Sequence, residues 1–486
     1  MRFFASFLFV LIVGCSVFSQ DRTADLVILN GNVLTMDEKR PRAEAIAVTG
    51  NIISAVGTNA EIRAVVGETT KVIDAKGGTV MPGFNDAHVH FMAIGNTFSS
   101  MDIKDVDTPE KLVERIKYYV RFLPKGRWIL GSGGSEALWK ADAAVLAKAL
   151  DESAPDNPVF LYNTDPASAL ANAVAMKKGG VKRAEGGIVG DGALERVRFA
   201  VPRDHTSRWA EIAETATNYA ASFGITSVQD VHSDDMAEAY RELERAGKLK
   251  TRVYDCISLS DAVAKKLSPP KNDPASMVRT GCVKGTHEGD DESTPKLLAD
   301  VIAADKAGWQ VAVHAIGTRT SYEVLDVFEA TIRENGPRDR RFKLEHAEGI
   351  SANDQKRAGK MNIIASIQPY LFGGGAGFGS GYYLGLQNAG MKLAYGSDAP
   401  MTAFDPMLTM QAADQTSGIS VYDIIRGYTV GSAYAEFAEK NKGTISSGKL
   451  ADIVILSEKV SEEKANVGNG AKVIVTIVNG KIVYGY

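Results

Sequence analysis

The sequence predicts an α/β protein: a TIM (β/α)8 barrel, a small β-sandwich domain built from both chain ends, and an insertion after barrel strand 1. Three observations lead to this fold class. Short apolar runs alternate with helix-like segments through the middle of the 486-residue chain, eight such runs can be counted, and the two chain ends share a motif. Strand–helix alternation is typical of parallel βαβ units, and eight units close a barrel.

The eight predicted barrel strands fall in the region that we assign to the barrel, residues 81–442. They lie in the runs "GTVMPGFNDAHVH", "GITSVQDVH", "TRVYDCISL", "GCVKGTH", "WQVAVHAIG", "FKLEHAEG", "IIASIQP" and "KLAYGSDAP". After the second run, segments such as "DDMAEAYRELERAGK" and "SYEVLDVFEATIREN" carry the apolar spacing of helices. Each strand is therefore expected to lead into a helix on the outside of the barrel.

The β-sandwich is expected from residues 22–80 together with 443–486. "ADLVIL" near the start is echoed by "ADIVIL" near the end, and both ends read as short strands separated by Gly and Asn turns. The pair Asn479–Gly480 is a strong hairpin signal. Two ends that each supply part of a sheet are most simply read as one domain, interrupted by the barrel.

The insertion covers about residues 95–210, between the first and second apolar runs. Helical pieces within it include "TPEKLVERIKYYVRFL" and "KADAAVLAKAL". We expect it to lie over the mouth of the barrel and to shape a pocket there with residues such as Trp139, which could equally be a core residue.

The N-terminus is expected to be a signal peptide over residues 1–19. Arg2 precedes the apolar stretch "FFASFLFVLIVG", which is too short to span a bilayer. "IVGC" resembles a bacterial lipobox, which would place a lipid and hence a membrane anchor on Cys15, and ordinary cleavage near Ser19 is the competing interpretation. Both lead to export, either to the periplasm or as a membrane-anchored lipoprotein.

Composition excludes some partners. The net charge is −4 and no basic stripe is present, so no nucleic-acid partner is expected. The apolar content of 45% is that of a globular chain with a substantial core. Beyond the predicted signal peptide, Cys256 and Cys282 both lie in strand-like runs and are read as small buried residues, with a single bridge left open.

A metal site is predicted where the first barrel strand ends. His88 and His90 are two residues apart, so in a strand both project to the same side, about 7 Å apart along the chain. Imidazole nitrogens suit zinc and similar metals. An isolated His-x-His pair is a weak signal on its own.

Four further candidates fall at the carboxyl ends of other predicted strands, where active sites of this barrel are built. They are Lys284, His314, His346 and Asp398. Four of the seven histidines of the chain are thereby used. Taken alone, Asp398 could be a helix N-cap and Lys284 an ion-paired lysine, but chance placement of all the candidates at strand ends is improbable.

Together these motifs resemble the metal-dependent amidohydrolase superfamily, in the branch called amidohydrolase family 3, which includes N-substituted formamide deformylases. The similarity rests on "PGFNDAHVH", "GITSVQD", "VHAIG", "LEHAEG", "GSDAPM" and the closing "GTISSGKLADIVIL". It extends over nearly the whole chain after the signal peptide.

The resemblance implies two divalent metal ions, expected to be zinc. The ligands that it implies are His88, His90, Lys284, His314, His346 and Asp398. The first two histidines and the aspartate would hold the more buried ion, and the other two histidines the second. The lysine would bridge them as a carboxylated lysine, since a carbamate has two oxygens that can span a metal pair about 3.5–4 Å apart.

The expected activity is metal-dependent hydrolysis of a non-peptide C–N (amide) bond in a small molecule. A metal-activated hydroxide would attack the carbonyl, and Asp398 would be the catalytic residue that takes the proton and passes it to the leaving nitrogen. Arg319, His287, Tyr370 and His232 are candidates for holding the substrate. The sequence departs from the branch where Thr318 and Tyr370 replace an expected Asp and His, so hydrolysis is better supported than any substrate.

Three alternatives are weighed. The same site could hydrolyse an ester, a lactone or a phosphotriester. The chain could be an inactive exported binding protein, although six ligands have no physical purpose in one. A deaminase of the same barrel would need a Glu and a further His after the fifth strand, and "HAIGTRTS" has no Glu there. Homo-oligomer formation stays open.

Overall fold

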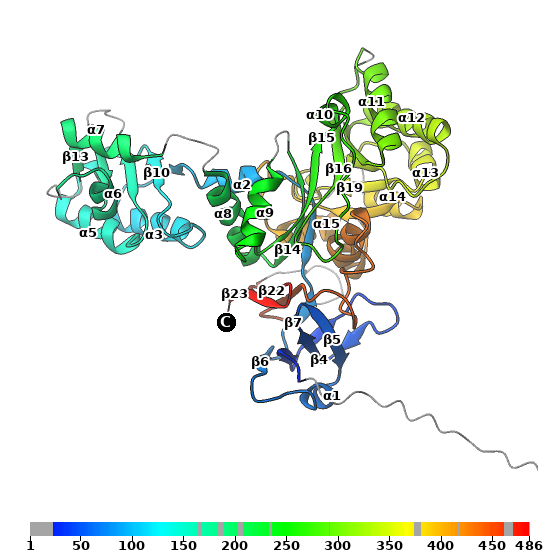
Figure 1. Cartoon of the computed structure of the whole chain (residues 1–486), viewed down its shortest axis with the longest axis horizontal. Coiled ribbons are helices and arrows are strands. Elements are labelled where there is room, and N and C mark those ends of the chain that lie inside the picture. The colour runs from blue at the N-terminus through cyan, green and yellow to red at the C-terminus, as the bar shows by residue number, and fades with distance from the viewer. Residues whose placement is uncertain are drawn as a thin grey trace, which may run out of the picture.

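The computed structural model describes residues 23–163, 168–182, 188–202, 208–232, 236–290, 292–373, 381–416, 418–460 and 470–485. Three bodies can be followed in Figure 1. A barrel with helices around it occupies the centre, a smaller all-β body lies below it, and a separate α/β lobe stands to one side.

The central body is a parallel eight-stranded sheet in the spatial order β20-β19-β18-β17-β16-β15-β14-β8. Its strands are β8 Phe84–Val89, β14 Ile225–Val231, β15 Arg252–Ser258, β16 Val278–Thr286, β17 Gln310–Ile316, β18 Lys343–Glu348, β19 Ile364–Ile367 and β20 Lys392–Tyr395. Each overlaps one of the eight predicted runs, with β16 beginning three residues before its run, so the predicted fold class is confirmed.

Helices follow the barrel strands and pack outside them, as the alternating pattern predicts. They are α2 Phe91–Thr97, α8 Trp209–Ser222, α9 Ala237–Arg245, α10 Leu259–Ala264, α11 Thr294–Ala307, α12 Thr318–Asn335, α13 Ala352–Lys360, α14 Tyr382–Asn388, α15 Pro406–Thr416, α16 Val421–Arg426 and α17 Ser432–Ala435. The largest hydrophobic cluster joins these helices to the strands. Burial on both faces explains why the strands read as continuous apolar runs.

The first and last strands, β8 and β20, meet at the seam of the barrel. The backbone N–H of Asp398 donates to the carbonyl of His88 at 2.8 Å, and that of His90 donates to Ala399 at 2.9 Å. Gly396 permits this approach, because a Cβ there would lie 2.6 Å from the backbone nitrogen of His88. The seam thereby brings His88 and His90, the first predicted ligands along the chain, next to Asp398, the last.

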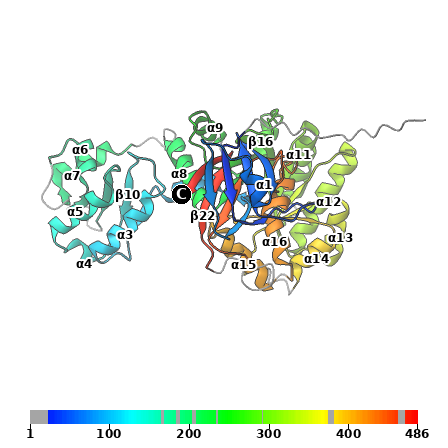
Figure 2. The ribbon, with the colours of Figure 1, turned by 90° about the horizontal axis from the view of Figure 1, so that it is seen from below.

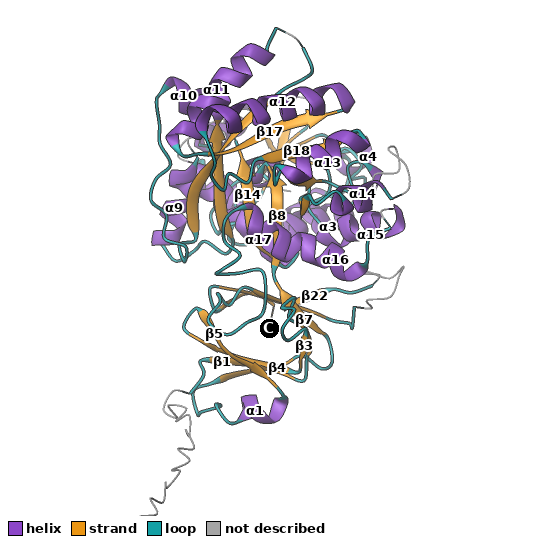
Figure 3. Ribbon diagram, turned by 90° about the vertical axis from the view of Figure 1, so that its right-hand side faces the viewer, coloured by secondary structure: helices purple, strands orange, loops and turns teal. Residues whose placement is uncertain are grey.

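The all-β body is the predicted sandwich. One sheet has the order β5-β4-β1-β6 and the other β23-β22-β21-β7-β2-β3. The strands are β1 Leu26–Leu29, β2 Asn32–Leu34, β3 Arg42–Ala43, β4 Ala45–Thr49, β5 Ile52–Gly57, β6 Lys71–Asp74, β7 Thr79–Pro82, β21 Ile453–Leu456, β22 Val473–Val478 and β23 Lys481–Gly485, with α1 Asn59–Arg63 outside. Residues from both chain ends share one apolar core between the sheets, and Figure 3 shows the two layers below the barrel.

A buried ion pair ties the sandwich to the barrel. Arg252, at the start of β15, donates from Nε to Asp452 at 2.6 Å and from Nη2 to Asn479 at 2.9 Å. The same aspartate accepts the backbone N–H of Asn479 at 2.8 Å. The hairpin signal at Asn479 thus lies at the joint between the two bodies.

The insertion forms a lobe of its own. Its sheet has the order β13-β12-β11-β10-β9. The elements are β9 Met101–Asp102, β10 Ile129–Ser132, β11 Val159–Tyr162, β12 Ser168–Ala171, β13 Ile188–Gly190, α3 Pro109–Val120, α4 Glu136–Trp139, α5 Ala143–Ser153, α6 Ala173–Lys178 and α7 Asp191–Ala200. The two helices expected from its sequence are α3 and α5.

The expected position of the insertion was wrong. Figures 1 and 2, taken at right angles, both show the lobe beside the barrel on the side of α2 and α8, not over its mouth. The cause is visible at the joint, where the buried guanidinium of Arg127 donates to the carbonyls of Gly95 on α2, at 3.3 Å, and Glu211 on α8, at 2.9 Å. Trp139 packs in the lobe core and donates to Gly133 at 2.9 Å, so it shapes no pocket at the barrel.

The predictions for the N-terminus and for the cysteines differ in whether the structure tests them. The predicted signal peptide and Cys15 lie outside the described residues. Within the residues described, no helix combines the length and apolarity needed to cross a bilayer. Cys256 and Cys282 are free and buried, as the first interpretation predicted.

Candidate active site

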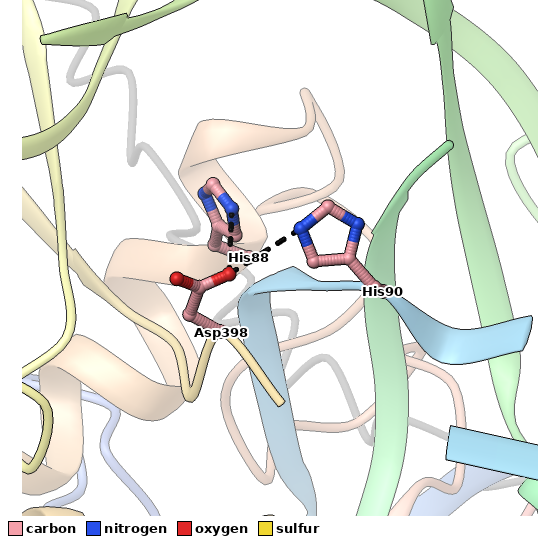
Figure 4. A group of neighbouring side chains, drawn as sticks. All are labelled: His88, His90 and Asp398. Carbon is pink, nitrogen blue, oxygen red and sulfur yellow. Dashed lines mark ion pairs between the residues drawn. The ribbon is translucent and has the colours of Figure 1, made fainter. Parts of the chain in front are cut away.

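Three predicted ligands converge at the barrel seam. His88, near the end of β8, is buried, and its Nε2 lies 3.3 Å from Oδ1 of Asp398. His90, just after the strand, points its Nε2 at the same oxygen from 3.4 Å. Figure 4 shows the two imidazoles converging on the one carboxylate. One donor atom from each of the three lies within 4.8 Å of the others, so a single cation could contact all three.

The other predicted ligands lie beside this group. The ring of His346 is centred 5.0 Å from that of His88 and 4.4 Å from that of His314. Burial and the nearby charge of Lys284 lower the pKa of His314, and burial and His88 lower that of His346 to about 3. Both histidines are thus held in the neutral form that binds metals. The structure brings all six predicted ligands to one end of the barrel.

The backbone around His346 allows two adjacent side chains, Glu345 and His346, to face the barrel interior together. Neighbours in a regular strand point to opposite faces. His346 and Ala347 have φ values of 71° and 51°, in the left-handed region, and the pairing of β17 with β18 shifts register there. Glu345 and His346 can therefore both face the interior. Asp398, with φ 58°, is a second predicted ligand in this conformation, and such outliers cluster at functional sites.

A buried ion pair that sequence reasoning missed lies beneath the ligands. Oε2 of Glu345 is 2.6 Å from Nδ1 of His88, and Oε1 is 2.9 Å from Nζ of Lys343, with both charged side chains fully buried. Although burial opposes ionisation, Lys343 and His88 hold the pKa of Glu345 well below its ordinary value. The carboxylate fixes the tautomer of His88, so that Nε2 is left for a metal.

A signal for this pair was present in the sequence. Lys343 and Glu345 alternate through "FKLEH", which is otherwise an apolar strand, so both had to face the barrel interior. Two opposite charges on the inward face of one strand are uncommon unless they pair with one another or with a ligand. That reasoning would have found Glu345 as a partner for one of the histidines.

The donor set fits a divalent metal ion. Imidazole nitrogens and a carboxylate oxygen at mutual contact distance are the usual ligands of zinc and related metals. Although burial opposes ionisation, hydrogen bonds from His88 and His90 hold the pKa of Asp398 far below its ordinary value, so it stays ionised. Among the described residues, the buried Nδ1 of His346 has no hydrogen-bond partner. A metal would satisfy a polar atom that is otherwise costly to bury.

A cavity of about 560 Å³ opens beside the ligands. His90 and Lys284 line it together with the apolar side chains of Met92, Trp209, Ile212 and Met236. This volume lies within the range of about 300–1,000 Å³ that is common for small-molecule sites.

The four substrate candidates are placed differently from one another. His232, whose Nε2 is hydrogen-bonded to Asp255, lines the cavity. His287 is buried and pairs with Glu323 at 2.6 Å. Arg319 pairs with the same carboxylate at 2.8 Å, and Tyr370 is 43% exposed. The described cavity wall contains none of these last three candidates.

Comparison with known proteins shows which chains this one resembles. The chain is 29% identical to Protein LONG AFTER FAR-RED 3 of Arabidopsis thaliana, over 95% of this chain and 92% of that protein. It is 26% identical to the N-substituted formamide deformylase of Arthrobacter pascens, over 95% of this chain and 98% of that enzyme.

Among solved structures, an uncharacterized metal-dependent hydrolase from Pyrococcus furiosus shares the fold. Its TM-score is 0.61 at 24% identity, over 89% of this chain and 99% of that one. A model of the Amidohydrolase family matches residues 71–484, which include the barrel, the lobe and about half of the sandwich. The chain therefore belongs to the amidohydrolase family and is a hydrolase of carbon–nitrogen bonds other than peptide bonds.

Proposed function

We propose that this chain cleaves an amide bond of a small molecule with the help of two zinc ions. The observation that carries the proposal is the convergence of His88, His90 and Asp398 at one end of the barrel, with His314 and His346 beside them. The cavity at the same end gives a substrate access to these residues.

Lys284 is the proposed bridge between the ions, as a carboxylated lysine. It lies on β16, whose last residue Thr286 pairs in register with His314 on β17. It lines the same cavity as His90. A carbamate at this position would reach toward both histidine groups with two oxygens, which suits a pair of cations.

The chain's own residues supply the proton chemistry. Zinc provides Lewis acidity, which polarises a carbonyl and makes water acidic enough to react near neutral pH. Asp398 accepts the proton of the attacking water, because its carboxylate is ionised and directed into the ligand group. Glu345 keeps His88 oriented meanwhile through the 2.6 Å hydrogen bond to Nδ1. As the water oxygen bonds to the carbonyl carbon and the C–N bond breaks, the electron pair of that bond stays with nitrogen, which takes up the proton held by Asp398.

Metal content is the first test. The mature chain would be purified from cells supplied with zinc and bicarbonate, beside His88→Ala and Lys284→Ala. We expect about two metal ions per chain in the wild type, none or few in His88→Ala, and fewer in Lys284→Ala. His287→Ala and Lys356→Ala are matched controls, since they remove a histidine and a lysine outside the ligand group. A well-folded wild type without metal would refute the proposal.

Activity is the second test. Because one relative is named an N-substituted formamide deformylase, a panel of N-formyl and N-acyl amides is the natural starting point, with esters and lactones beside it. Faster turnover of the esters than of every amide would replace the amide assignment with an esterase.

We also propose that the chain is exported, either as a lipoprotein that begins at an acylated Cys15 or after ordinary cleavage of a signal peptide near Ser19. The support is the sequence of the N-terminus alone. Mass spectrometry of the mature protein would detect an acylated N-terminal cysteine, whereas a chain that begins after Ser19 would exclude the lipid.

A further inference from the structure

We infer that the cavity selects amides whose non-reacting part is uncharged and largely apolar, and rejects amides that carry a carboxylate there. The inference rests on the proposed amide hydrolysis and adds the chemical class of the substrate. Two observations carry the inference: the side chains that form the cavity wall, and the existing partners of the charged side chains near it.

The cavity wall combines predicted ligands with apolar side chains. His90 and Lys284 belong to the predicted ligand group, so the scissile bond is expected to bind next to them. Met92 on α2 and Ile212 on α8 are buried apolar side chains of the same wall, and Trp209 and Met236 are half-buried. The wall also includes the neutral polar side chains Asn96, Ser258 and Thr286. A substituent bound against the four apolar side chains exchanges water for hydrocarbon and aromatic surface, which favours apolar groups.

In the described part of the cavity wall, no lysine or arginine outside the predicted ligand group is placed to pair with an anionic substituent. Within the part of the chain that the structure describes, the cavity wall contains no arginine, and its only lysine is Lys284. Arg319, expected from the sequence to hold substrate, is ion-paired with Glu323 and is not part of the wall. A carboxylate bound against the apolar side chains would lose its hydration without gaining a counter-charge.

The acidic groups near the cavity are already engaged. Asp230 accepts the backbone N–H of Phe91 at 2.7 Å and the hydroxyl of Tyr240 at 2.6 Å. Asp255 is hydrogen-bonded to His232 and accepts from Thr280 at 2.7 Å. These carboxylates repel an anion, and their existing hydrogen bonds leave them poor partners for a substrate cation.

The test compares amides that differ only at one remote position. N-formyl and N-acetyl derivatives of 4-methylbenzylamine, 4-carboxybenzylamine and 4-(aminomethyl)benzylamine present a neutral, an anionic and a cationic group of similar size. We expect kcat/KM for the carboxylate to be about 100-fold or more below that for the methyl compound, because an unpaired buried charge is strongly disfavoured. The cationic compound is expected to lie at least about 10-fold below the methyl compound.

Binding to the metal-free protein supplies a readout that does not depend on turnover. Calorimetry with the same compounds should give the same order of affinity, because the apolar wall does not require metal. Met236→Lys adds a cation to the wall and should lower the ratio of kcat/KM for the methyl compound to kcat/KM for the carboxylate at least 10-fold. Val145→Lys, an exposed change on α5, should leave this ratio unchanged.

The possible outcomes distinguish a failure of the selectivity inference from a failure of the proposed amide hydrolysis. If the wild type hydrolyses the carboxylate as fast as the methyl compound, the inference is wrong and amide hydrolysis stands. If it hydrolyses no amide but the calorimetric order holds, the proposed reaction fails and the selectivity of the cavity stands. If calorimetry shows no discrimination either, both are overturned.

Discussion

Replacing Glu345 by Gln separates two roles of this carboxylate. The residue forms a buried ion pair with Lys343, N to O 2.9 Å, and a 2.6 Å hydrogen bond with His88. In Glu345→Gln, the Lys343 ammonium keeps its hydrogen bonds to the carbonyl of Ala87, at 3.0 Å, and to Gln229, at 3.1 Å, but loses its counter-charge. Removing one partner of a buried pair costs about 3–5 kcal/mol of unfolding free energy. Urea denaturation of the metal-free protein measures this loss.

The double variant Lys343→Met/Glu345→Gln removes the orphaned charge. Most of the stability should return, because replacing both members of a buried pair with neutral groups of similar size is often close to neutral. The remaining defect is at His88, whose Nδ1 no longer faces a carboxylate. Loss of such a partner lowers metal affinity about 10–100-fold, or about 1.4–2.7 kcal/mol. Competition with a chelator of known affinity measures it.

Two results would refute this reasoning. Wild-type metal affinity in the double variant would show that Glu345 does not orient His88. A single Glu345→Gln variant as stable as the double variant would show that Lys343 does not depend on the carboxylate for its burial. The first result would contradict the role of Glu345 in orienting His88, and the second would contradict its role as the counter-charge of Lys343.

Three further predictions follow from named contacts. Gly396→Ala should cost about 1–3 kcal/mol of stability and lower metal content, because the new Cβ meets the backbone of His88 at 2.6 Å; an unchanged melting temperature would contradict this close contact at the seam. Asp452→Ala leaves buried Arg252 without its anion and should cost about 3–5 kcal/mol, measured by denaturation; a loss below 1 kcal/mol would show that the joint does not need the pair. Arg127→Met removes donors to α2 and α8 and should speed proteolysis between lobe and barrel, whereas cleavage at the wild-type rate would show that other contacts hold the lobe.

Local chemistry in the sequence determined the barrel and the positions of its candidate ligands. The eight strands are apolar runs because both of their faces are buried, and that pattern does not depend on distant residues. His88, His314, His346 and Asp398 could be placed at strand ends because parallel strands of a barrel all end on the same side. The His-x-His spacing then fixed which two side chains share a face.

Tertiary structure alone decided the rest. The left-handed backbone at His346, which allows its neighbour Glu345 also to face inward, depends on a register shift against β17 that no local pattern predicts. The lobe lies beside the barrel because Arg127 finds carbonyl acceptors on α2 and α8, contacts between residues distant in sequence. The cavity wall, too, is assembled from several elements, so the absence of arginine and of any lysine other than Lys284 from its described part could be seen only after folding. The spacing of apolar residues indicates which side chains are buried and which face they occupy, whereas contacts between distant segments depend on the geometry of the whole chain.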